Sequence, residues 1–515
     1  MFVDVTRLYE HIPKRHFYER LSGLLDLTFL YELTKPLYAD KMGRPSLDPV
    51  VFFKCQLFGF FENVVSDTRL EFEIADSLLA RKFIGYTLEE RTPDESTLRK
   101  TRQRMPLMVF ERVFSYVLEV CQREGLLKGR VLGTDGTLVD ANASMDSLQH
   151  KELGCSYEEY IRALRRQDEP EATREDAVRA DREREGKASN KEWESGTDAD
   201  SKVMQHADGH THLSYKLDTT VDLETGVIVQ AGASHGNVGD ASDFLQRVDE
   251  AVEELSGLGL APEAVVADKG HHTGENLAGM EERGLVALVS SRTDNRKPTG
   301  FRREDFEYDP ARDVVVCPVG ERLRRVADAS APTHLEFRSK PSACRACPHF
   351  GVCTKSGRGR SITISVYEGL VAANRLRVHS EEWLPWVRIR RQYGEAPFAY
   401  FKMFGGLRRL SGRGLEFAMK KALLAALGFN LLKVVRTSML SGPVAPFWAA
   451  LAALRALYRL TKEVSRLGRR LSGEAWRAAR GADGGTAERR PTREWALRAW
   501  RACRRSPLYP GAASH

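Results

Sequence analysis

The chain has 515 residues, too many for one compact hydrophobic core, so we expect two to four domains. Hydrophobic residues make up 42% of it and charged residues 29%, and without a run of about 18 uncharged apolar residues we expect no membrane span. The first residues lack the apolar run of an export signal, so we expect a cytoplasmic protein with reduced cysteines. The net charge is +7, yet residues 455–505 hold fifteen Lys or Arg against five Asp or Glu. Such a basic tail suits nucleic acid, and it equally suits a solvated helical appendage.

Residues 1–125 have the pattern of a helical N-terminal domain. Apolar residues recur three to four apart in "DPVVFFKCQLFGFFENV" and "DTRLEFEIADSLLARKFIG", where Asp48 and Asp67 are the candidate N-terminal caps. The turn "KMGRPS" carries Arg44, and the helix start "TPDESTLRKTRQRM" carries Arg99 and Arg102. Basic helix faces suit contacts to the DNA backbone, so we expect these three arginines to bind DNA, although a solvated face is the commoner explanation of any one of them.

The pattern after this domain predicts an α/β catalytic domain over residues 126–440. The segments "GRVLGTDGTLVDA", "HLSYKLDTTVDLETGVIVQAGAS", "PEAVVADKG" and "GLVALVSS" read as strands, and "DASDFLQRVDEAVEEL" reads as an amphipathic helix, so we expect a mixed sheet. Two polar stretches interrupt it, at about residues 145–200 and 299–361. The first is too poor in apolar residues to own a core. Residues 441–515 form the predicted basic helical tail.

Three carboxylates stand out by their surroundings. Asp135 is flanked by glycines inside an apolar strand, Asp268 ends a buried strand, and Glu395 is the one acid in "RIRRQYGEAPFAYFKMFGGLRRL". Either aspartate taken singly is more often a turn or capping residue. Together the three suggest hard oxygen ligands for Mg²⁺, and two such ions about 3.5–4 Å apart would clamp both oxygens of a phosphoryl displacement. Glu395 would then be acidic because metal meets DNA there.

Helical spacing links Glu395 to two basic residues. Arg391, Glu395 and Lys402 are four and seven residues apart and share one helix face. Pro397 fits only the first turn of an unkinked helix, so we expect the helix to begin near Glu395 or to bend there.

These motifs resemble those of DDE-type transposases of bacterial insertion sequences, in the group with a Y-x2-R-x3-E-x6-K signature. Arg391, Glu395 and Lys402 match that spacing, whereas Arg388 occupies the tyrosine position. The segments "GTDGT" and "ADKGHHTGEN" resemble the regions of the first and second aspartates, with His271 where an aromatic residue is frequent. "GRPSLDPVVFFK" and "TPDESTLRKTRQR" resemble the helical N-terminal domain of these enzymes.

The resemblance implies a ribonuclease-H-like catalytic core with the two polar stretches as insertions. It implies Mg²⁺-dependent hydrolysis at transposon ends, followed by attack of the freed 3′-hydroxyl on target DNA. Asp135, Asp268 and Glu395 would hold two Mg²⁺ ions, and Arg391 and Lys402 would hold phosphate. The partner would be double-stranded DNA, both transposon ends and target, engaged by a homodimer and without a membrane.

The alternative is a non-catalytic DNA-binding protein derived from a transposase. The intact set of three acids argues against it, whereas Arg388 and the atypical His271 leave it open.

The second polar stretch contains a group of four cysteines, Cys317, Cys344, Cys347 and Cys353. One CxxC with two outlying cysteines resembles a zinc knuckle, with His349 as a spare ligand. The alternative is four reduced thiols in a loop-rich insertion. Because that insertion has little apolar sequence of its own, we expect bound zinc to supply much of its folding energy.

Overall fold

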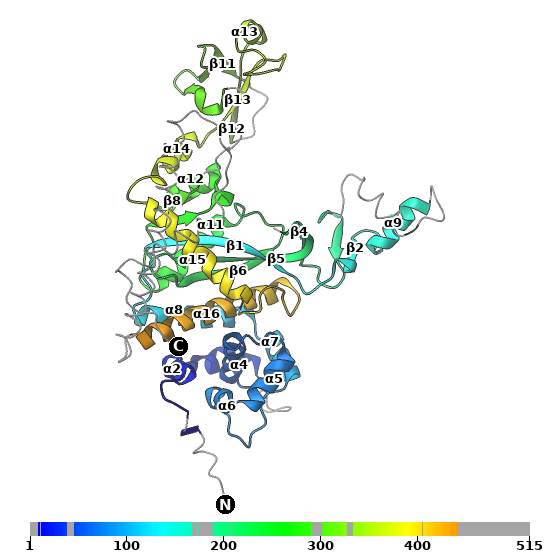
Figure 1. Ribbon diagram of the computed structural model, residues 1–515, viewed down its shortest axis with the longest axis vertical. Helices are drawn as coiled ribbons and strands as arrows, with labels where there is room; N and C mark the ends of the chain where they lie inside the picture. The colour runs from blue at the N-terminus through cyan, green and yellow to red at the C-terminus, as the bar shows by residue number, and fades with distance from the viewer. Residues whose placement is uncertain are drawn as a thin grey trace, which may run out of the picture. The chain divides into compact units, whose positions relative to one another are not determined.

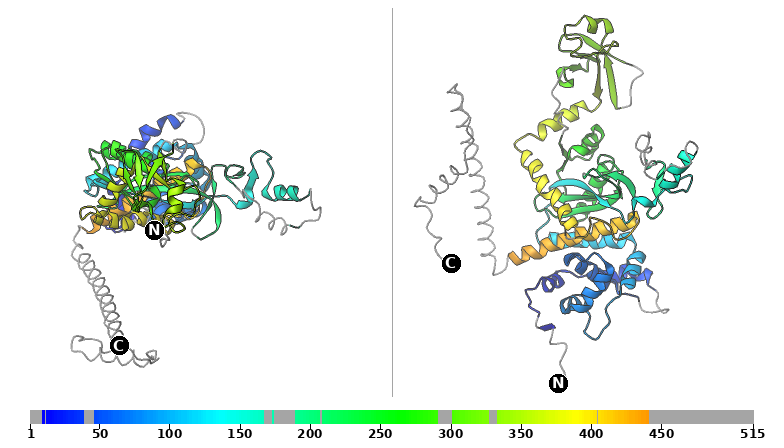
Figure 2. Two further views of the ribbon diagram at one scale, coloured as in Figure 1. Left: turned by 90° about the horizontal axis from the view of Figure 1, so that it is seen from above. Right: turned by 45° about the vertical axis from the view of Figure 1, so that its right-hand side comes forward.

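The computed structural model describes residues 9–10, 12–38, 46–166, 173, 189–206, 208–290, 301–326, 333–403 and 405–440. The chain divides into two compact units, residues 1–437 and 438–515. Of the second unit only residues 438–440 are described, so the predicted basic tail lies outside the described residues. The first unit contains both the N-terminal helices and the sheet (Figures 1 and 2).

The described N-terminal region is helical, as predicted. Its helices are α2 (Phe17–Leu24), α3 (Phe29–Thr34), the 3₁₀ helix η1 (Lys35–Leu37), α4 (Pro49–Phe61), α5 (Asp67–Asp76), α6 (Leu78–Ile84), α7 (Glu95–Arg104) and α8 (Leu107–Arg123). Helix α4 is apolar on nearly every face, and its Phe52 and Phe53 are completely buried. Helix α5 is capped by Ser66, whose Oγ accepts the Arg69 N–H. The expectation that Asp67 caps it was wrong, because that side chain pairs with Arg102.

The central feature of the first unit is a mixed sheet, as predicted, and it has six strands, of which β4 was not predicted. Its strands are β1 (Val131–Asp140), β4 (Lys202–Gln205), β5 (Thr211–Asp222), β6 (Ile228–His235), β7 (Ala264–Ala267) and β8 (Val286–Val289). The order is β6-β5-β1-β7-β8, and β4 pairs with the start of β5. Strands β6, β5 and β1 are antiparallel neighbours, whereas β7 and β8 run parallel to β1. Helix α11 (Phe244–Gly257) connects β6 to β7, and α12 (Gly274–Glu282) connects β7 to β8.

Helices α11 and α15 (Leu384–Met403) pack on opposite faces of this sheet (Figure 1). Arg247 of α11 contacts Asp218 of β5, whose partner in the register is Gly136 of β1. Arg390 of α15 contacts Asp135. Because side chains alternate along a strand, Asp135 and Gly136 face opposite sides. The carboxyl of Asp135 therefore lies on the α15 face and that of Asp218 on the α11 face.

Two further helices, α14 (Glu368–Arg377) and α16 (Leu415–Leu440), complete the described part of the chain. Helix α16 runs beside α8 in Figure 1 and in the right view of Figure 2, and Lys420 lies over the Phe110 ring. Among the helices that the structure describes, none is both long and apolar enough to cross a membrane.

The first polar stretch, which we expected to lack a core, contains a small aromatic cluster. The 3₁₀ helix η2 (Met145–Ser147) precedes β2 (Leu148–His150), which pairs with β3 (Trp193–Ser195), and α9 (Tyr157–Arg166) lies between these strands in the sequence. Trp193 is buried, and the rings of His150, Tyr157 and Tyr160 pack against it. These four rings thus form a small packed cluster in a stretch whose composition is otherwise polar.

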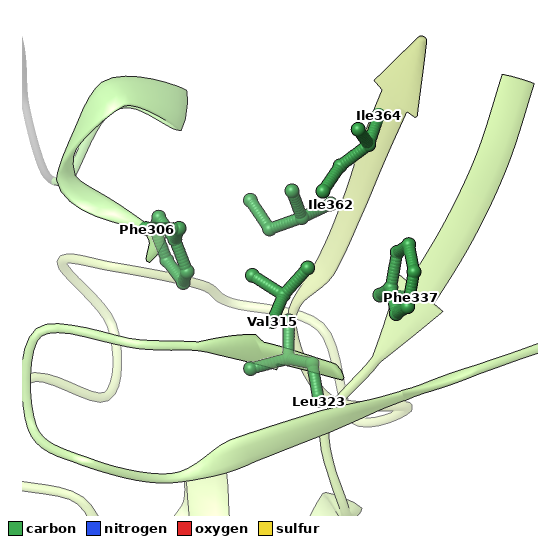
Figure 3. Close-up of a cluster of buried hydrophobic side chains, with 6 residues drawn as sticks. All are labelled: Phe306, Val315, Leu323, Phe337, Ile362 and Ile364. Atoms are coloured by element: carbon green, nitrogen blue, oxygen red, sulfur yellow. The ribbon is translucent and has the colours of Figure 1, made fainter. Parts of the chain in front are cut away.

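The second polar stretch folds into a separate five-stranded antiparallel sheet, which we call the cysteine-bearing sheet (residues 301–367). It comprises η4 (Arg303–Asp305), β9 (Glu307–Asp309), β10 (Val314–Val316), β11 (Arg322–Arg325), β12 (His334–Arg338), α13 (Pro341–Ala346) and β13 (Ser361–Ser365), in the strand order β13-β12-β11-β10-β9. Its buried side chains are Phe306, Val315, Leu323, Phe337, Ile362 and Ile364 (Figure 3). The expectation that this stretch lacks apolar sequence for a core was wrong, because strand alternation gathers its sparse apolar residues on one face.

Candidate active site

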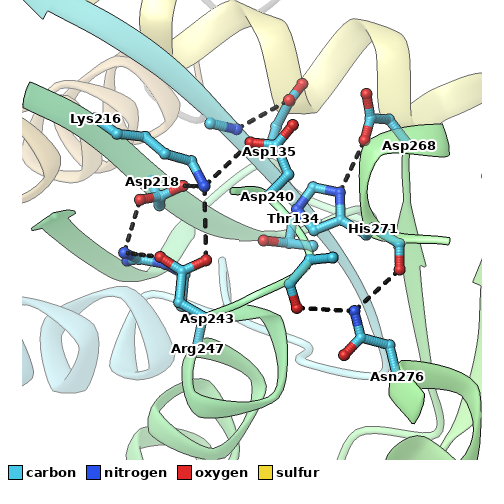
Figure 4. Close-up of polar contacts among 12 residues, drawn as sticks. Thr134, Asp135, Lys216, Asp218, Asp240, Asp243, Arg247, Asp268, His271 and Asn276 are labelled. Atoms are coloured by element: carbon cyan, nitrogen blue, oxygen red, sulfur yellow. Dashed lines mark hydrogen bonds and ion pairs between the residues drawn. The ribbon is translucent and has the colours of Figure 1, made fainter. Parts of the chain in front are cut away.

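Asp135, in the middle of β1, and Asp268, directly after β7, lie side by side on neighbouring parallel strands. In the β1–β7 register, Gly133 faces Val266, so two residues further along each chain Asp135 is level with Asp268. Parallel strands are about 4.8 Å apart, and residues at the same level point to the same face. Both side chains therefore lie on the α15 side (Figure 4). The structure brings together two of the three predicted acids from segments far apart in the sequence.

The carboxyl of Asp135 is mostly buried and is held by two donors. Its Oδ1 accepts the Gly136 N–H at 2.9 Å, and its Oδ2 accepts a hydrogen bond from Arg390 Nη1 at 3.0 Å. Burial raises the pKa of Asp135, and the charge of Asp268 adds to this rise. The Arg390 guanidinium and the Gly136 N–H oppose it without cancelling it. Asp135 is thus a carboxyl that favours a cation beside it.

The carboxyl of Asp268 has the opposite electrostatic character. Its Oδ1 accepts hydrogen bonds from His271 Nδ1 and from the Gly270 N–H, both at 2.8 Å. The His271 hydrogen bond, with the Gly270 N–H, lowers the pKa of Asp268 to about 2 despite partial burial. Asp268 is therefore ionised at neutral pH, and among the described residues its Oδ2 has no hydrogen-bond partner.

Helix α15 covers the two acids through its small and apolar side. Gly394, Pro397, Phe398 and Phe401 are its buried residues, and a β-carbon on Gly394 would lie 3.5 Å from Asp135 Oδ2. The helix begins at Leu384 and not near Glu395, so the first of the two expectations was wrong, and the other, a bend at this point, stays a prediction. Pro397 forfeits one backbone hydrogen bond inside the helix, and its buried ring offsets that loss by packing.

Arg391, Glu395 and Lys402 occupy the adjoining side of α15. Arg391 and Glu395 are exposed, whereas Lys402 is half-buried and its Nζ donates to Thr137 Oγ1 at 2.7 Å. Burial lowers the pKa of Lys402. Thr137 is on the same face of β1 as Asp135, two residues further on, so this side of α15 borders the two acids.

The carboxylates of Asp135 and Asp268 are the kind of ligand that a hard cation binds, but two carboxylates alone do not make a full set of protein ligands. Two carboxylates side by side are the ligands that Mg²⁺ prefers. Over the described part of the chain, however, no group of three or more His, Cys, Asp or Glu side chains is gathered closely enough to hold a metal ion. Glu395 is exposed on α15, and a guanidinium contacts Asp135 Oδ2. Arg390 thus supplies the positive charge that the paired carboxylates require.

Arg390 and the hydrogen-bonding role of His271 were missed from the sequence. The run "RIRRQYGE" offers three arginines, and only the burial of Gly394 and Phe398, at four and eight residues from Arg390, identifies which one faces the sheet. His271 was noted only as an atypical residue. Its position three residues after Asp268 is compatible with a hydrogen bond within a tight turn, a signal that could have been used.

Two of the three predicted DNA-binding arginines of the N-terminal region lie in the described part of the chain, in different environments. Arg44 lies outside the described residues. Arg99 is exposed and pairs with Glu95 one helical turn earlier. Arg102 is 5% exposed, and its guanidinium is bound by Asp67 and the Gln56 side chain, so in this structure it is turned away from solvent.

The four cysteines of the second polar stretch line one pocket of about 350 Å³ together with His349. Cys344 Sγ lies 2.9 Å from Ser339 Oγ, and Cys317 Sγ accepts the Glu321 N–H at 3.3 Å. All four are free thiols of intermediate exposure, and burial raises the pKa of Cys353. The structure brings the cysteines to one place, although, as stated above for the described residues, they do not form a completed metal group.

Two stretches of the chain match family models. Residues 6–104 match the model described as "Transposase domain (DUF772)", and residues 316–435 match the one described as "Transposase DDE domain". Both are transposase domains. The second match includes Glu395 and the four cysteines, whereas Asp135 and Asp268 lie between the two matches. The matches support a DDE-type transposase.

Whole proteins and solved structures resemble this chain only weakly. No curated protein matches the chain. Among solved structures, a piggyBac transposase synaptic complex with hairpin DNA is 10% identical, with 84% of this chain and 81% of that chain covered and a TM-score of 0.23. A Mos1 mariner paired-end complex with Mn is 9% identical, with 56% and 71% covered and a TM-score of 0.15. Similarities at this level carry no argument about fold or function.

Proposed function

We propose that this protein is a DNA transposase of the DDE type that cleaves the ends of an insertion sequence and joins them to target DNA. The observation that carries the proposal is that Asp135 of β1 and Asp268, directly after the parallel strand β7, lie side by side next to α15. The strand order β6-β5-β1-β7-β8 supports a ribonuclease-H-like core. We assign residues 1–125 to DNA binding, 126–440 to catalysis, and 441–515 to a basic tail.

Asp135, Asp268 and Glu395 would hold two Mg²⁺ ions. When bound, these ions would polarise the scissile phosphate and favour the ionised form of the attacking oxygen. Asp268 supplies a carboxylate that is already ionised at neutral pH, held in orientation by His271. Glu395 would join the two aspartates from α15, and Arg390 would leave Asp135 for a phosphate oxygen. Each of these movements is confined to side chains on one helix.

The proposed chemistry has two steps, hydrolysis at the transposon end and strand transfer into the target. In the first, a water oxygen forms a bond to phosphorus while the bond from phosphorus to the 3′-oxygen of the transposon end breaks. In the second, that 3′-hydroxyl oxygen bonds to a target phosphorus and a target 3′-oxygen leaves. Arg391 and Lys402 would hold non-bridging phosphate oxygens through both steps, which is a positioning role. We propose that a homodimer on DNA brings two ends together.

The test uses the full chain and duplex DNA carrying the sequences that flank its reading frame. We expect Mg²⁺-dependent breaks that leave 3′-hydroxyl ends, and joined products with a second duplex. Asp135→Ala, Asp268→Ala and Glu395→Ala should each lower cleavage at least about a thousandfold with nearly unchanged binding, since metal ligands act on the transition state. Glu382→Ala, which removes an exposed acid just before α15, is the matched control. Cleavage at the original rate in one of the three variants would remove that residue from the site.

The phosphate-holding role of Arg391 and Lys402 has its own test. Arg391→Ala and Lys402→Ala should weaken DNA binding and reduce the slope of log affinity against log salt by about one each. If DNA binding in a salt titration is unchanged, Arg391 and Lys402 do not contact DNA and instead help to hold α15 in place.

One observation favours the second candidate, a non-catalytic DNA-binding protein. Asp135 is held by Arg390, and Glu395 is exposed, so the acids are not arranged as a completed metal group in the described chain. DNA binding without cleavage under all metal conditions would favour it.

A further inference from the structure

A cluster of buried charges lies on the α11 face of the sheet, behind the two aspartates. Lys216 Nζ is 3.2 Å from Asp218 Oδ1, 3.1 Å from Asp240 Oδ1 and 3.5 Å from Asp243 Oδ1. Arg247 Nη2 lies 2.7 Å from Asp218 Oδ2 and 2.9 Å from Asp243 Oδ2 (Figure 4). The side chains of Lys216 and Asp218 are only 4% and 3% exposed. Both bases, Asp218 and Asp243 are mostly buried, whereas Asp240 lies at the edge of the cluster and is 48% exposed.

Such a cluster is not explained by stability alone. Burying charges costs free energy that ion pairing only partly offsets, and well-packed apolar side chains would serve the fold at least as well. Burial by itself lowers the pKa of Lys216, but attraction to Asp218, Asp243 and Asp240 outweighs it, so the pKa is raised and Lys216 stays charged. Lys216 and the three aspartates around it are therefore held at defined positions in the fold by their ion pairs.

The cluster touches the backbone beside each candidate catalytic aspartate. A β-carbon on Gly136, the residue after Asp135, would lie 2.5 Å from Asp218 Oδ1. A β-carbon on Gly270 would lie 2.5 Å from Asp240 Oδ2. Both glycines leave room for a carboxylate of the cluster, so the cluster is in direct contact with the segments that carry the two acids.

Asp240 and Asn276 together hold the turn in which Asp268 is oriented. The Gly270 N–H and His271 Nδ1 are the two donors to Asp268 Oδ1. Asp240 packs against Gly270, and the buried Asn276 donates from Nδ2 both to the Ala241 carbonyl and to the His271 carbonyl, each at 3.0 Å. The loop before α11 is thereby tied to the turn after β7 by two separate contacts.

We propose that Asp240, anchored by Lys216, is a positioning residue that fixes the Asp268 turn from behind the sheet. Lys216 is held in turn by Asp218 and Asp243, so the position of Asp240 is set by a network that also abuts Asp135. The network thereby keeps Asp135 and Asp268 at a fixed distance from each other, ready to bind a cation. This inference rests on the proposed function, because its readout is the binding of a divalent cation by Asp135 and Asp268.

The experiment measures Mn²⁺ binding to the full chain without DNA, by calorimetry, for Asp240→Asn. The side chain of Asp240 is 48% exposed, and Lys216 keeps Asp218 and Asp243, so we expect the melting temperature to change little. We expect Mn²⁺ affinity to fall about tenfold, the loss typical when a partner behind a metal ligand is removed. Asp249→Asn is the matched control, because Asp249 lies on α11, is 53% exposed and pairs with Arg283 away from the cluster.

A double-variant cycle separates positioning from a general structural role. Gly270→Ala places a methyl group 2.5 Å from Asp240 Oδ2 and 3.0 Å from Asp268 Oδ1, so it should also weaken Mn²⁺ binding. Added to Asp240→Ala it should cost less than it does alone, because the closest of these contacts is then removed whereas the contact with Asp268 stays. Losses that simply add would overturn the proposed contact.

Asp268→Asn distinguishes failure of this inference from failure of the proposed function. If Asp268→Asn loses Mn²⁺ and Asp240→Asn binds it like the original protein, the positioning role is wrong and the metal site stands. If neither change affects Mn²⁺ binding, both the proposed site and the positioning role are overturned.

Discussion

The α/β sheet and the cysteine-bearing sheet gather their important side chains in opposite ways. The site at Asp135 draws on a strand, a turn and a helix that are more than a hundred residues apart, and it is bordered by charges. The cysteine-bearing sheet uses one continuous stretch of chain, and its centre is six apolar side chains. Burial of charged groups therefore costs the first region free energy, whereas burial of apolar area stabilises the second.

The largest expected effect is in the core of the cysteine-bearing sheet. Phe337 is completely buried there, so Phe337→Ala should lower the free energy of unfolding of this sheet by about 3–5 kcal/mol, through lost burial and a cavity. Limited proteolysis between residues 301 and 367 should detect it. Val319→Ala, at a side chain that is 52% exposed, is the control. Equal protection of Phe337→Ala and the original protein would contradict a core centred on this residue.

The next effect concerns the ion pair at Asp135. Arg390→Gln removes the cation beside a mostly buried carboxyl, so in metal-free buffer we expect the free energy of unfolding to fall by about 2 kcal/mol. Mn²⁺ should restore most of this loss, because a bound cation replaces the guanidinium. Arg391→Gln, at the exposed neighbouring residue, should change neither value. Denaturant unfolding with and without Mn²⁺ measures both, and an equal Mn²⁺ effect on the two variants would argue against a cation site at Asp135.

A third prediction tests zinc in the cysteine-bearing sheet. We propose that the four thiols hold one structural Zn²⁺ per chain, a set that leaves no position for a reacting water. Cys344→Ser combined with Cys347→Ser should lose the metal and expose the loops at residues 341–359 to protease. The sheet around Phe337 should stay protected, since its core is apolar. Elemental analysis without zinc in freshly prepared reduced protein would remove the metal from this region.

The smallest effect is the hydrogen bond from His271 to Asp268. His271→Phe keeps a ring against Phe244 and removes the donor, so we expect a loss of about 1 kcal/mol near neutral pH. The folded-state pKa of Asp268 is lowered to about 2, below the unfolded value of about 3.9. The stability it contributes is therefore present above about pH 4 and is lost as the pH falls through 2. Unfolding free energies over this range should converge for the two proteins, and a pH-independent difference would point to packing alone.

Several features of the site could be read from local patterns. The glycine-flanked Asp135 lies inside an apolar strand and Asp268 ends another, as the sequence predicts, because apolar runs and the polar residues that interrupt or end them are local signals. The shared face of Arg391, Glu395 and Lys402 followed from helical spacing alone. Arg102 shows the limit of such reasoning. It belongs to a basic helix face by sequence, yet Asp67 and Gln56 turn it inward.

By itself the sequence determined the helical N-terminal region, five strands of the mixed sheet and the strands to which Asp135 and Asp268 belong, because each depends on residues within a few positions of one another. Only the tertiary structure decided that Arg390 meets Asp135, 255 residues away, and that Lys216 and Asp240 support the turn of Asp268. It also decided that sparse apolar residues in the second polar stretch form a core. The physical reason is common to all three. Periodicity states which side chains share a face, but which face meets which partner depends on the packing of distant segments.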